Sequence, residues 1–225
     1  MPLPLRHPRH VPPYRPMLAS TGLPAGSLLD YCVEPKMDGW RCMVEVDDGR
    51  LTVRSRTGRL MTEAVPELAP LSRSGCSLVL DGELCAGTAD DPHLGTMRSF
   101  YELSGRLAGR PRSTSTAVTY VVFDILALDD RPLVDQPCDE RRQVLERFDL
   151  GPARLVPRYQ GADALDLLRA CERLDLEGIV LKSTASPYRS GRASARSQTW
   201  WKVKQPGWIA AGHAERRRPP ERRSA

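Results

Sequence analysis

The sequence predicts an α+β protein in which two packed, largely antiparallel sheets carry flanking helices. Three observations predict this class. Short segments alternate apolar and polar residues between turn signals, residues 117–128 form a nearly continuous apolar run, and residues 139–148 and 162–174 carry apolar side chains at helical spacing. The 225 residues are enough for one sizeable core or two small domains, and a content of 40% hydrophobic and 27% charged residues fits an ordinary globular protein.

The ends of the chain differ from its middle in composition. Residues 1–15 are rich in proline and arginine and are expected to form an extended lead-in. Residues 209–225 contain five arginines and are interpreted as a basic, disordered tail, with an electrostatic contact to DNA phosphates as the alternative. A folded domain is therefore expected over residues 16–208. With no apolar segment of transmembrane length and no secretory leader, the sequence predicts a cytoplasmic protein without membrane contacts.

The first half of the domain is expected to be mostly strand. A strand begins near Tyr31, and residues 42–46 and 51–55 alternate on either side of the turn at residues 47–49, which predicts a hairpin. Residues 63–71 are predicted to form a short helix interrupted by Pro66. Residues 77–85 form a further strand, in which Asp81 and Glu83 share one face because they are two positions apart.

The second half alternates helices with strands. A short helix is expected around residues 96–107, and residues 117–128 predict a strand that is buried on both faces. Helices follow at residues 139–148 and 162–174, and short strands at residues 178–182 and 200–204. The six cysteines form no CxxC pair and are expected to be reduced thiols.

The lysines point to a reactive site. The chain contains twenty-nine arginines but four lysines, at positions 36, 182, 202 and 204. Arginine keeps its charge at any accessible pH, whereas lysine can lose a proton and attack an electrophile. Lys36 lies in the segment Glu34-Pro35-Lys36-Met37-Asp38-Gly39-Trp40-Arg41, and neighbouring cations would disfavour its protonated form. It is the predicted nucleophile.

Further segments supply the parts that such a nucleophile needs. Carboxylates beside glycines occur at Asp81-Gly82-Glu83 and Glu177-Gly178, where the glycines would let a ligand approach the backbone. Arg56 lies in the loop Ser55-Arg56-Thr57-Gly58, and Lys202 and Lys204 share one face of a strand. Carboxylates can hold Mg²⁺, and cations can stabilise charge on a transferring phosphoryl group. The combination predicts a nucleotidyl transferase.

The order KxDGxR, SRTG, LDGEL, VFDIL, EGIVLK and WxKxK resembles the nucleotidyltransferase superfamily of ATP-dependent DNA ligases, and most closely the ligase modules of bacterial end-joining ligases. The tracts Pro16–Ala19 and Ser186–Arg192 are similar to that subgroup as well. The resemblance covers residues 16–204 and implies an ATP-grasp-like nucleotidyltransferase fold. It gives no role to Tyr188 or Arg192 of the second tract.

The resemblance also implies a role for each motif residue. Lys36 would form the lysyl-AMP phosphoramidate. Glu34 would lie near the adenine, and Phe123 would stack on it. Arg41 and Arg56 would contact ribose and phosphate. The remaining motif residues would bind the ribose, a metal ion or the AMP phosphate: Glu83 at the ribose or metal, Glu177 at the metal, and Lys182, Lys202 and Lys204 at the phosphate.

The implied reaction uses ATP and Mg²⁺ and joins nicked or broken double-stranded DNA in repair or recombination, at the nucleoid of a bacterial cytoplasm. Ligases of this kind carry an OB-fold after the last lysine motif, whereas about twenty residues follow Lys204 here. The sequence therefore predicts that an OB-fold or end-joining protein acts as a separate partner. Two alternatives stay open: a catalytically weak nucleotide- or DNA-binding module derived from a ligase, and an RNA ligase or capping guanylyltransferase.

Overall fold

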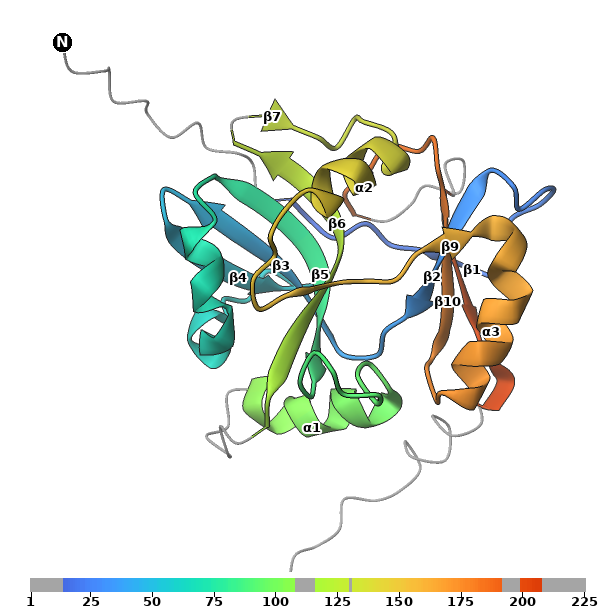
Figure 1. Ribbon diagram of the computed structural model, residues 1–225, viewed down its shortest axis with the longest axis horizontal. Coiled ribbons are helices and arrows are strands. Elements are labelled where there is room, and N and C mark those ends of the chain that lie inside the picture. Colours follow the sequence, from blue (N-terminus) through green and yellow to red (C-terminus); the bar gives the residue numbers. More distant parts are fainter. Residues whose placement is uncertain (1–13, 108–115, 130, 192–198, 208–225) are drawn as a thin grey trace, which may run out of the picture.

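The computed structural model describes residues 14–107, 116–129, 131–191 and 199–207, which form two sheets (Figure 1). The first sheet has the strand order β1 (Ser20–Thr21), β11 (Trp200–Lys204), β10 (Gly178–Ser183), β2 (Tyr31–Lys36) and β9 (Tyr159–Gln160). The second has the order β4 (Arg50–Ser55), β3 (Trp40–Asp47), β5 (Leu78–Ala86), β6 (Val118–Leu128) and β7 (Arg131–Pro132), with β8 (Arg154–Leu155) also paired to β6. The pairings β1–β11 and β6–β8 are parallel, and the others are antiparallel.

Three α-helices pack on the sheets. Helix α3 (Ala164–Arg173) lies on the outer side of the first sheet, against β10 and β2. Helix α1 (Met97–Leu107) packs against β5, and α2 (Cys138–Glu146) packs against β6. The predicted α+β architecture of two largely antiparallel sheets with flanking helices is therefore confirmed.

Alternation along the strands of the second sheet gives its two faces different partners. Even-numbered residues of β3 and β5, such as Val44 and Leu80, enter the largest apolar cluster with α1 and the short helix that precedes β5. Odd-numbered residues, such as Met43 and Val79, pack with Trp200 of the first sheet. The charged residues Arg41, Asp81 and Glu83 share this odd parity, so they too face the first sheet.

Most of the predicted elements are present. The hairpin is β3–β4, with Asp48 at φ 47° and Gly49 at φ 71°, as a type I′ turn requires. β6 is buried on both faces, and α1, α2 and α3 match the predicted helices within a few residues. All six cysteines are free thiols, and five are buried.

The predicted helix at residues 63–71 is not an α-helix, and the predicted chain ends lie almost wholly outside the described residues. Residues 62–64 and 66–73 form the 3₁₀ helices η1 (Thr62–Ala64) and η2 (Pro66–Arg73) rather than an α-helix, because Pro66 and Pro70 lack the backbone N–H groups that i→i−4 bonds need. A third 3₁₀ helix, η3 (Gly161–Asp163), precedes α3. Of the predicted lead-in at residues 1–15 only positions 14 and 15 are described, and the tail at residues 209–225 lies outside the described residues.

Within the described ranges, no helix is both long enough and apolar enough to cross a lipid bilayer.

Candidate functional site

A cavity of about 260 Å³ lies between the two sheets. The first sheet contributes even-numbered residues of β2, β10 and β11, and the second contributes odd-numbered residues of β3, β5 and β6. Eight of the predicted site residues line it: Glu34, Lys36, Arg41, Arg56, Glu83, Phe123, Lys182 and Lys202. The other two, Glu177 and Lys204, do not line the cavity. Glu177 contacts Lys36 directly, and Lys204 contacts Glu177.

Strand register brings the two remaining residues to Lys36. Gly178 pairs with Lys36 on β2 and with Lys204 on β11, so these three residues form one row across the sheet. Glu177 directly precedes this row. One of its carboxylate oxygens contacts the Lys36 ammonium, and the other lies 2.7 Å from the Lys204 ammonium. Glu177 is 3% exposed and Lys36 is 24% exposed, so the lysine remains open to the cavity while its partner is buried.

Two more carboxyl groups surround the nucleophile position. Burial, followed by the charge of Glu177, raises the pKa of Asp38 to about 7. Burial also raises the pKa of Glu83 to about 7, although the Lys36 and Arg41 cations act in the opposite direction. Both groups therefore exchange protons near neutral pH. Asp38 belongs to the lysine motif, but the sequence predicts no role for it.

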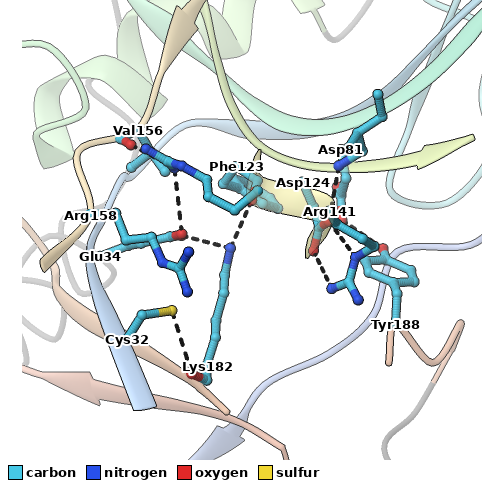
Figure 2. Close-up of polar contacts among 12 residues, drawn as sticks. Cys32, Glu34, Asp81, Phe123, Asp124, Arg141, Val156, Arg158, Lys182 and Tyr188 are labelled. Atoms are coloured by element: carbon cyan, nitrogen blue, oxygen red, sulfur yellow. Dashed lines mark hydrogen bonds and ion pairs between the residues drawn. The ribbon is translucent and has the colours of Figure 1, made fainter. Parts of the chain in front are cut away.

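At the deep end of the cavity, Lys182 forms an ion pair with Glu34 (Figure 2). Its ammonium lies 2.6 Å from the Glu34 carboxylate and donates a 2.9 Å hydrogen bond to the Phe123 carbonyl. Lys182 is 1% exposed, and its ammonium also lies 4.9 Å from the centre of the Phe123 ring and 4.4 Å from that of Trp200. Burial acts to lower the pKa of Lys182, but Glu34 together with Asp124 and the thiols of Cys138 and Cys32 outweighs it, so the pKa is raised.

A β-bulge lies at Phe123, on the wall of the cavity. The register of β5 and β6 changes from Gly82–Val122 to Asp81–Asp124, which leaves Phe123 without a partner on β5. Alternation from Val121, which pairs with Glu83, directs the Phe123 side chain toward the first sheet, and the Phe123 carbonyl accepts the hydrogen bond from Lys182. The sequence places Phe123 in a strand but gives no signal for the bulge.

Arg41 is held in place by Asp81. Its Nε and Nη2 atoms donate to the two carboxylate oxygens at 3.0 and 2.6 Å, and its guanidinium lies 5.1 Å from the centre of the Phe123 ring. Burial acts against the charge of Arg41, but Asp81 outweighs it and raises the pKa of the guanidinium. Asp81 is fully buried and was not predicted as a site residue, although its parity with Glu83 marked the correct face.

The cations near the mouth of the cavity are less buried. Arg56 is exposed in the loop after β4, where its backbone N–H donates to the Arg41 carbonyl at 3.0 Å. Partial burial lowers the pKa of Lys202, and the nearby ammonium groups of Lys36 and Lys204 lower it further. An anion bound here would relieve this repulsion.

The glycines beside the carboxylates serve packing instead of ligand approach, which corrects the prediction made for them. A Cβ atom on Gly82 would lie 2.5 Å from the ring of Tyr120. A Cβ atom on Gly178 would lie 2.0 Å from the Val203 carbonyl oxygen, and Gly178 adopts φ 147°. Both positions require glycine because neighbouring strands approach closely.

The donor set of the cavity suits a nucleoside polyphosphate: cations around the mouth, an aromatic ring on one wall and a buried carboxylate at the deep end. For a divalent metal, the described residues contain no cluster of three or more His, Cys, Asp or Glu side chains. Glu83 lines the cavity, and Mg²⁺ is commonly held by one or two carboxylates together with substrate phosphates. Glu83 therefore fits a Mg²⁺ ion, whereas Glu177 would first have to release a lysine.

Comparison with known proteins gives consistent matches. Residues 16–204 match the family model described as "ATP dependent DNA ligase domain". The chain is 33% identical over 195 residues to the "Multifunctional non-homologous end joining protein LigD" of Mycolicibacterium smegmatis, with 85% of this chain and 24% of that protein covered. It is 36% identical over 208 residues to the "Probable DNA ligase" of Streptomyces coelicolor, with 85% and 39% covered.

Solved structures agree. The structure titled "mycobacterial DNA ligase D complexed with ATP and MES" superposes with a TM-score of 0.68 at 29% identity, covering 85% of this chain and 60% of that one. The ligase domain of LigD from M. tuberculosis gives a TM-score of 0.67 at 30% identity, with 85% and 59% covered. The chain thus spans well under half the length of the two curated relatives it matches.

Proposed function

Because the chain belongs to the ATP-dependent DNA ligase domain family, we propose that it is an adenylation domain that forms a lysyl-AMP intermediate and passes AMP to DNA. One observation carries the proposal. Lys36, the lysine of the family motif, ends β2 at a cavity whose mouth holds Arg41, Arg56 and Lys202. The proposed nucleophile and the proposed phosphate-binding cations therefore come from two different sheets and line one cavity, whose side chains suit a nucleotide. The adenylation domain is proposed to cover residues 16–208.

In the first step, the neutral Lys36 amine attacks the α-phosphorus of ATP. An N–P bond forms, the bond to the pyrophosphate oxygen breaks, and the amine loses a proton. Glu177 already contacts the Lys36 nitrogen, and Asp38, with a pKa near 7, lies beside Glu177. These two carboxyl groups are the proposed proton acceptors, since Glu177 contacts the nitrogen that must be deprotonated and Asp38 is hydrogen-bonded to Glu177.

Two further transfers complete the proposed cycle. An oxygen of the DNA 5′-phosphate attacks the phosphorus of lysyl-AMP, the N–P bond breaks, and Lys36 takes a proton. The DNA 3′-hydroxyl then attacks the activated 5′-phosphate, loses its proton and displaces AMP. The proposed substrate is nicked or broken double-stranded DNA in repair, which suits the similarity to a non-homologous end joining protein and to a probable DNA ligase. The proposed place of action is the nucleoid of a bacterial cytoplasm.

The nucleotide is proposed to lie with its base deep in the cavity and its phosphates at the mouth. Phe123 would stack on the adenine and Glu34 would lie beside it, since both line the deep end. Arg41 and Arg56 would contact ribose and phosphate. Lys202 and Lys204 would bind the AMP phosphate, and Lys182 would join them once its ammonium leaves Glu34.

The carboxylates are proposed to serve the metal. Glu83 would hold Mg²⁺ or the ribose, and Glu177 would join the metal site on releasing Lys36 or Lys204. When bound, Mg²⁺ would neutralise charge on the triphosphate. An OB-fold segment or an end-joining protein is the proposed partner for sealing, because orientation of the leaving group and enclosure of DNA call for more surface than this cavity provides.

The test is covalent labelling with α-³²P-ATP and Mg²⁺. We expect one AMP per chain, mapped by peptide mass spectrometry to Lys36 and lost in Lys36→Ala. Lys36→Arg is the matched control, because it keeps the positive charge but cannot act as the nucleophile. Persistent labelling of either variant would remove Lys36 from the mechanism. The assay is run with and without a separate OB-fold protein, which separates loading of AMP from sealing.

Two outcomes would favour the alternatives. ATP binding without an added AMP mass would identify a nucleotide-binding module that has lost catalysis. Preferential labelling by GTP in place of ATP would point to the capping guanylyltransferases, and sealing of RNA but not DNA would point to the RNA ligases.

A further inference from the structure

The Tyr188 hydroxyl lies at a junction behind the cavity. It donates a 2.6 Å hydrogen bond to Oδ2 of Asp81 and accepts a 2.7 Å hydrogen bond from the backbone N–H of Met17. Tyr188 is 2% exposed and does not line the cavity. Sequence motifs mark the tract that contains it, yet the reaction proposed above uses no atom of this residue.

Asp81 connects the tyrosine to the cavity. The carboxylate oxygen that accepts from Tyr188 also accepts from Nη2 of Arg41 at 2.6 Å, and its other oxygen accepts from Nε of Arg41 at 3.0 Å (Figure 2 shows Asp81 and Tyr188). A bidentate carboxylate fixes the plane of a guanidinium. The phenol therefore restrains the carboxylate that sets the direction of Arg41 over the Phe123 ring.

The tyrosine itself is held on both sides. Its backbone N–H donates to the Val134 carbonyl at 2.7 Å, its ring meets Trp200 edge to face at a centroid distance of 5.6 Å, and the Arg141 guanidinium lies 5.8 Å from its ring centre. Arg141 is fully buried on Asp124, with bonds of 2.8 and 2.9 Å. Burial and the neighbouring Asp81 raise the pKa of Tyr188 well above its ordinary value, so the phenol remains a donor at physiological pH.

We infer that Tyr188 is a positioning residue for adenylylation, which acts through Asp81 to aim the Arg41 guanidinium at the bound nucleotide. The inference rests on the proposed function, because adenylylation is the reaction concerned. The hydrogen bonds that link Tyr188, Asp81 and Arg41 do not depend on that function. The bond to Met17 adds a second link, because Leu18 and Ala19, which follow Met17, line the cavity. The two sequence tracts at residues 16–19 and 186–192 are thus joined by one hydroxyl.

The test is a double-mutant cycle of Tyr188→Phe and Arg41→Lys, read by the second-order rate constant of AMP labelling and by the Kd of ATP without Mg²⁺. Tyr188→Phe alone should lower the rate constant on the order of tenfold, the factor expected for one hydrogen bond to a charged group. In the Arg41→Lys background, the same change should have an effect of less than about twofold, because Lys cannot make the bidentate pair that Tyr188 supports.

Tyr120→Phe is the matched control. It removes another buried tyrosine hydroxyl, which donates to the Cys42 carbonyl at 3.2 Å and does not bond to Asp81, and its labelling should stay within about twofold of wild type. Equal effects of Tyr188→Phe in both backgrounds would overturn the inference. Loss of cooperative melting in the Tyr188→Phe variant would also overturn it, since the hydroxyl would then support the fold only. If the wild type binds ATP but is not labelled, the proposed function fails. The same double-mutant cycle, read by the Kd of ATP, then still decides whether Tyr188 positions Arg41.

Discussion

Three of the four lysines neutralise two buried carboxylates. Lys36 and Lys204 share Glu177, and Lys182 pairs with Glu34. These pairs give the lysines a fixed position before any ligand binds, which reduces the ordering that binding would otherwise require. These pairs also mean that a lysine must leave its carboxylate in order to bind a phosphate. The released carboxylate could then bind a metal ion or a proton.

Asp38 gives a prediction for pH dependence. Its pKa is raised from 3.8 to about 7 in the folded protein, so between these values the folded state binds more protons than the unfolded state. Stability therefore falls as pH rises from about 4 to about 7, and the cost is fully present above pH 7. The charged groups that face Asp38 include Glu177, Lys36, Lys204 and Glu83.

Replacing Asp38 with Asn removes this titration. The variant should be more stable than wild type at pH 8 by on the order of 2 kcal/mol and equal to it near pH 4. Urea denaturation at the two pH values measures the difference. A stability gain of the same size at both would show that the effect is not one of protonation.

At the scale of elements, the pattern of apolar residues in the sequence was sufficient to predict the long helices and strands. The hairpin and the helices α2 and α3 follow from alternation or helical spacing, because each has enough residues to show a period, and β6 follows from its continuous apolar run. The two-residue strands β1, β7, β8 and β9 show no period; partners distant in the chain define β1, β8 and β9, and β7 pairs with the adjacent end of β6. Ion pairs such as Lys182–Glu34 likewise depend on the register of β10 with β2.

The site was predictable in its composition but not in its geometry. The motifs identify ten residues, eight of which line one cavity. They do not reveal that β6 has a bulge at Phe123, or that Asp81 and Tyr188 stand behind Arg41. A bulge and a hydrogen bond across more than a hundred residues leave no local pattern, since both result from the packing of separate strands.

The contact between β10 and β11 predicts a strong effect of Gly178→Ala. The new methyl group would meet the Val203 carbonyl at 2.0 Å, separate the two strands and disturb the Glu177–Lys204 pair. We expect a loss of about 2–4 kcal/mol in the free energy of unfolding. Gly151→Ala is the control: Gly151 also has positive φ but open space around it, so about 1 kcal/mol is expected. Equal losses in urea denaturation would refute the steric explanation.

At the scale of the whole molecule, the cavity joins two sheets that have separate apolar clusters on their outer sides. A ligand that contacts both sheets binds the folded state only, so it should stabilise the molecule as a unit. ATP at one hundred times its Kd should add about 2.7 kcal/mol and raise the melting temperature by roughly 5–10 °C.

Scanning calorimetry without Mg²⁺ measures this shift while limiting AMP transfer. Lys202→Ala should reduce the shift at a fixed ATP concentration, because it removes a cation from the mouth of the cavity. A shift of equal size in both proteins would place the nucleotide elsewhere.

The short link between Lys36 and Arg41 has a mechanical consequence. Lys36 is the last residue of β2 in one sheet, and Trp40 is the first of β3 in the other. Four residue steps span at most about 14 Å when fully extended. The segment is therefore a tether of fixed reach: at this edge the sheets cannot separate further without unravelling a strand. Any wider separation of the two sheets must therefore open away from this edge, so the Lys36 amine and the Arg41 guanidinium move together.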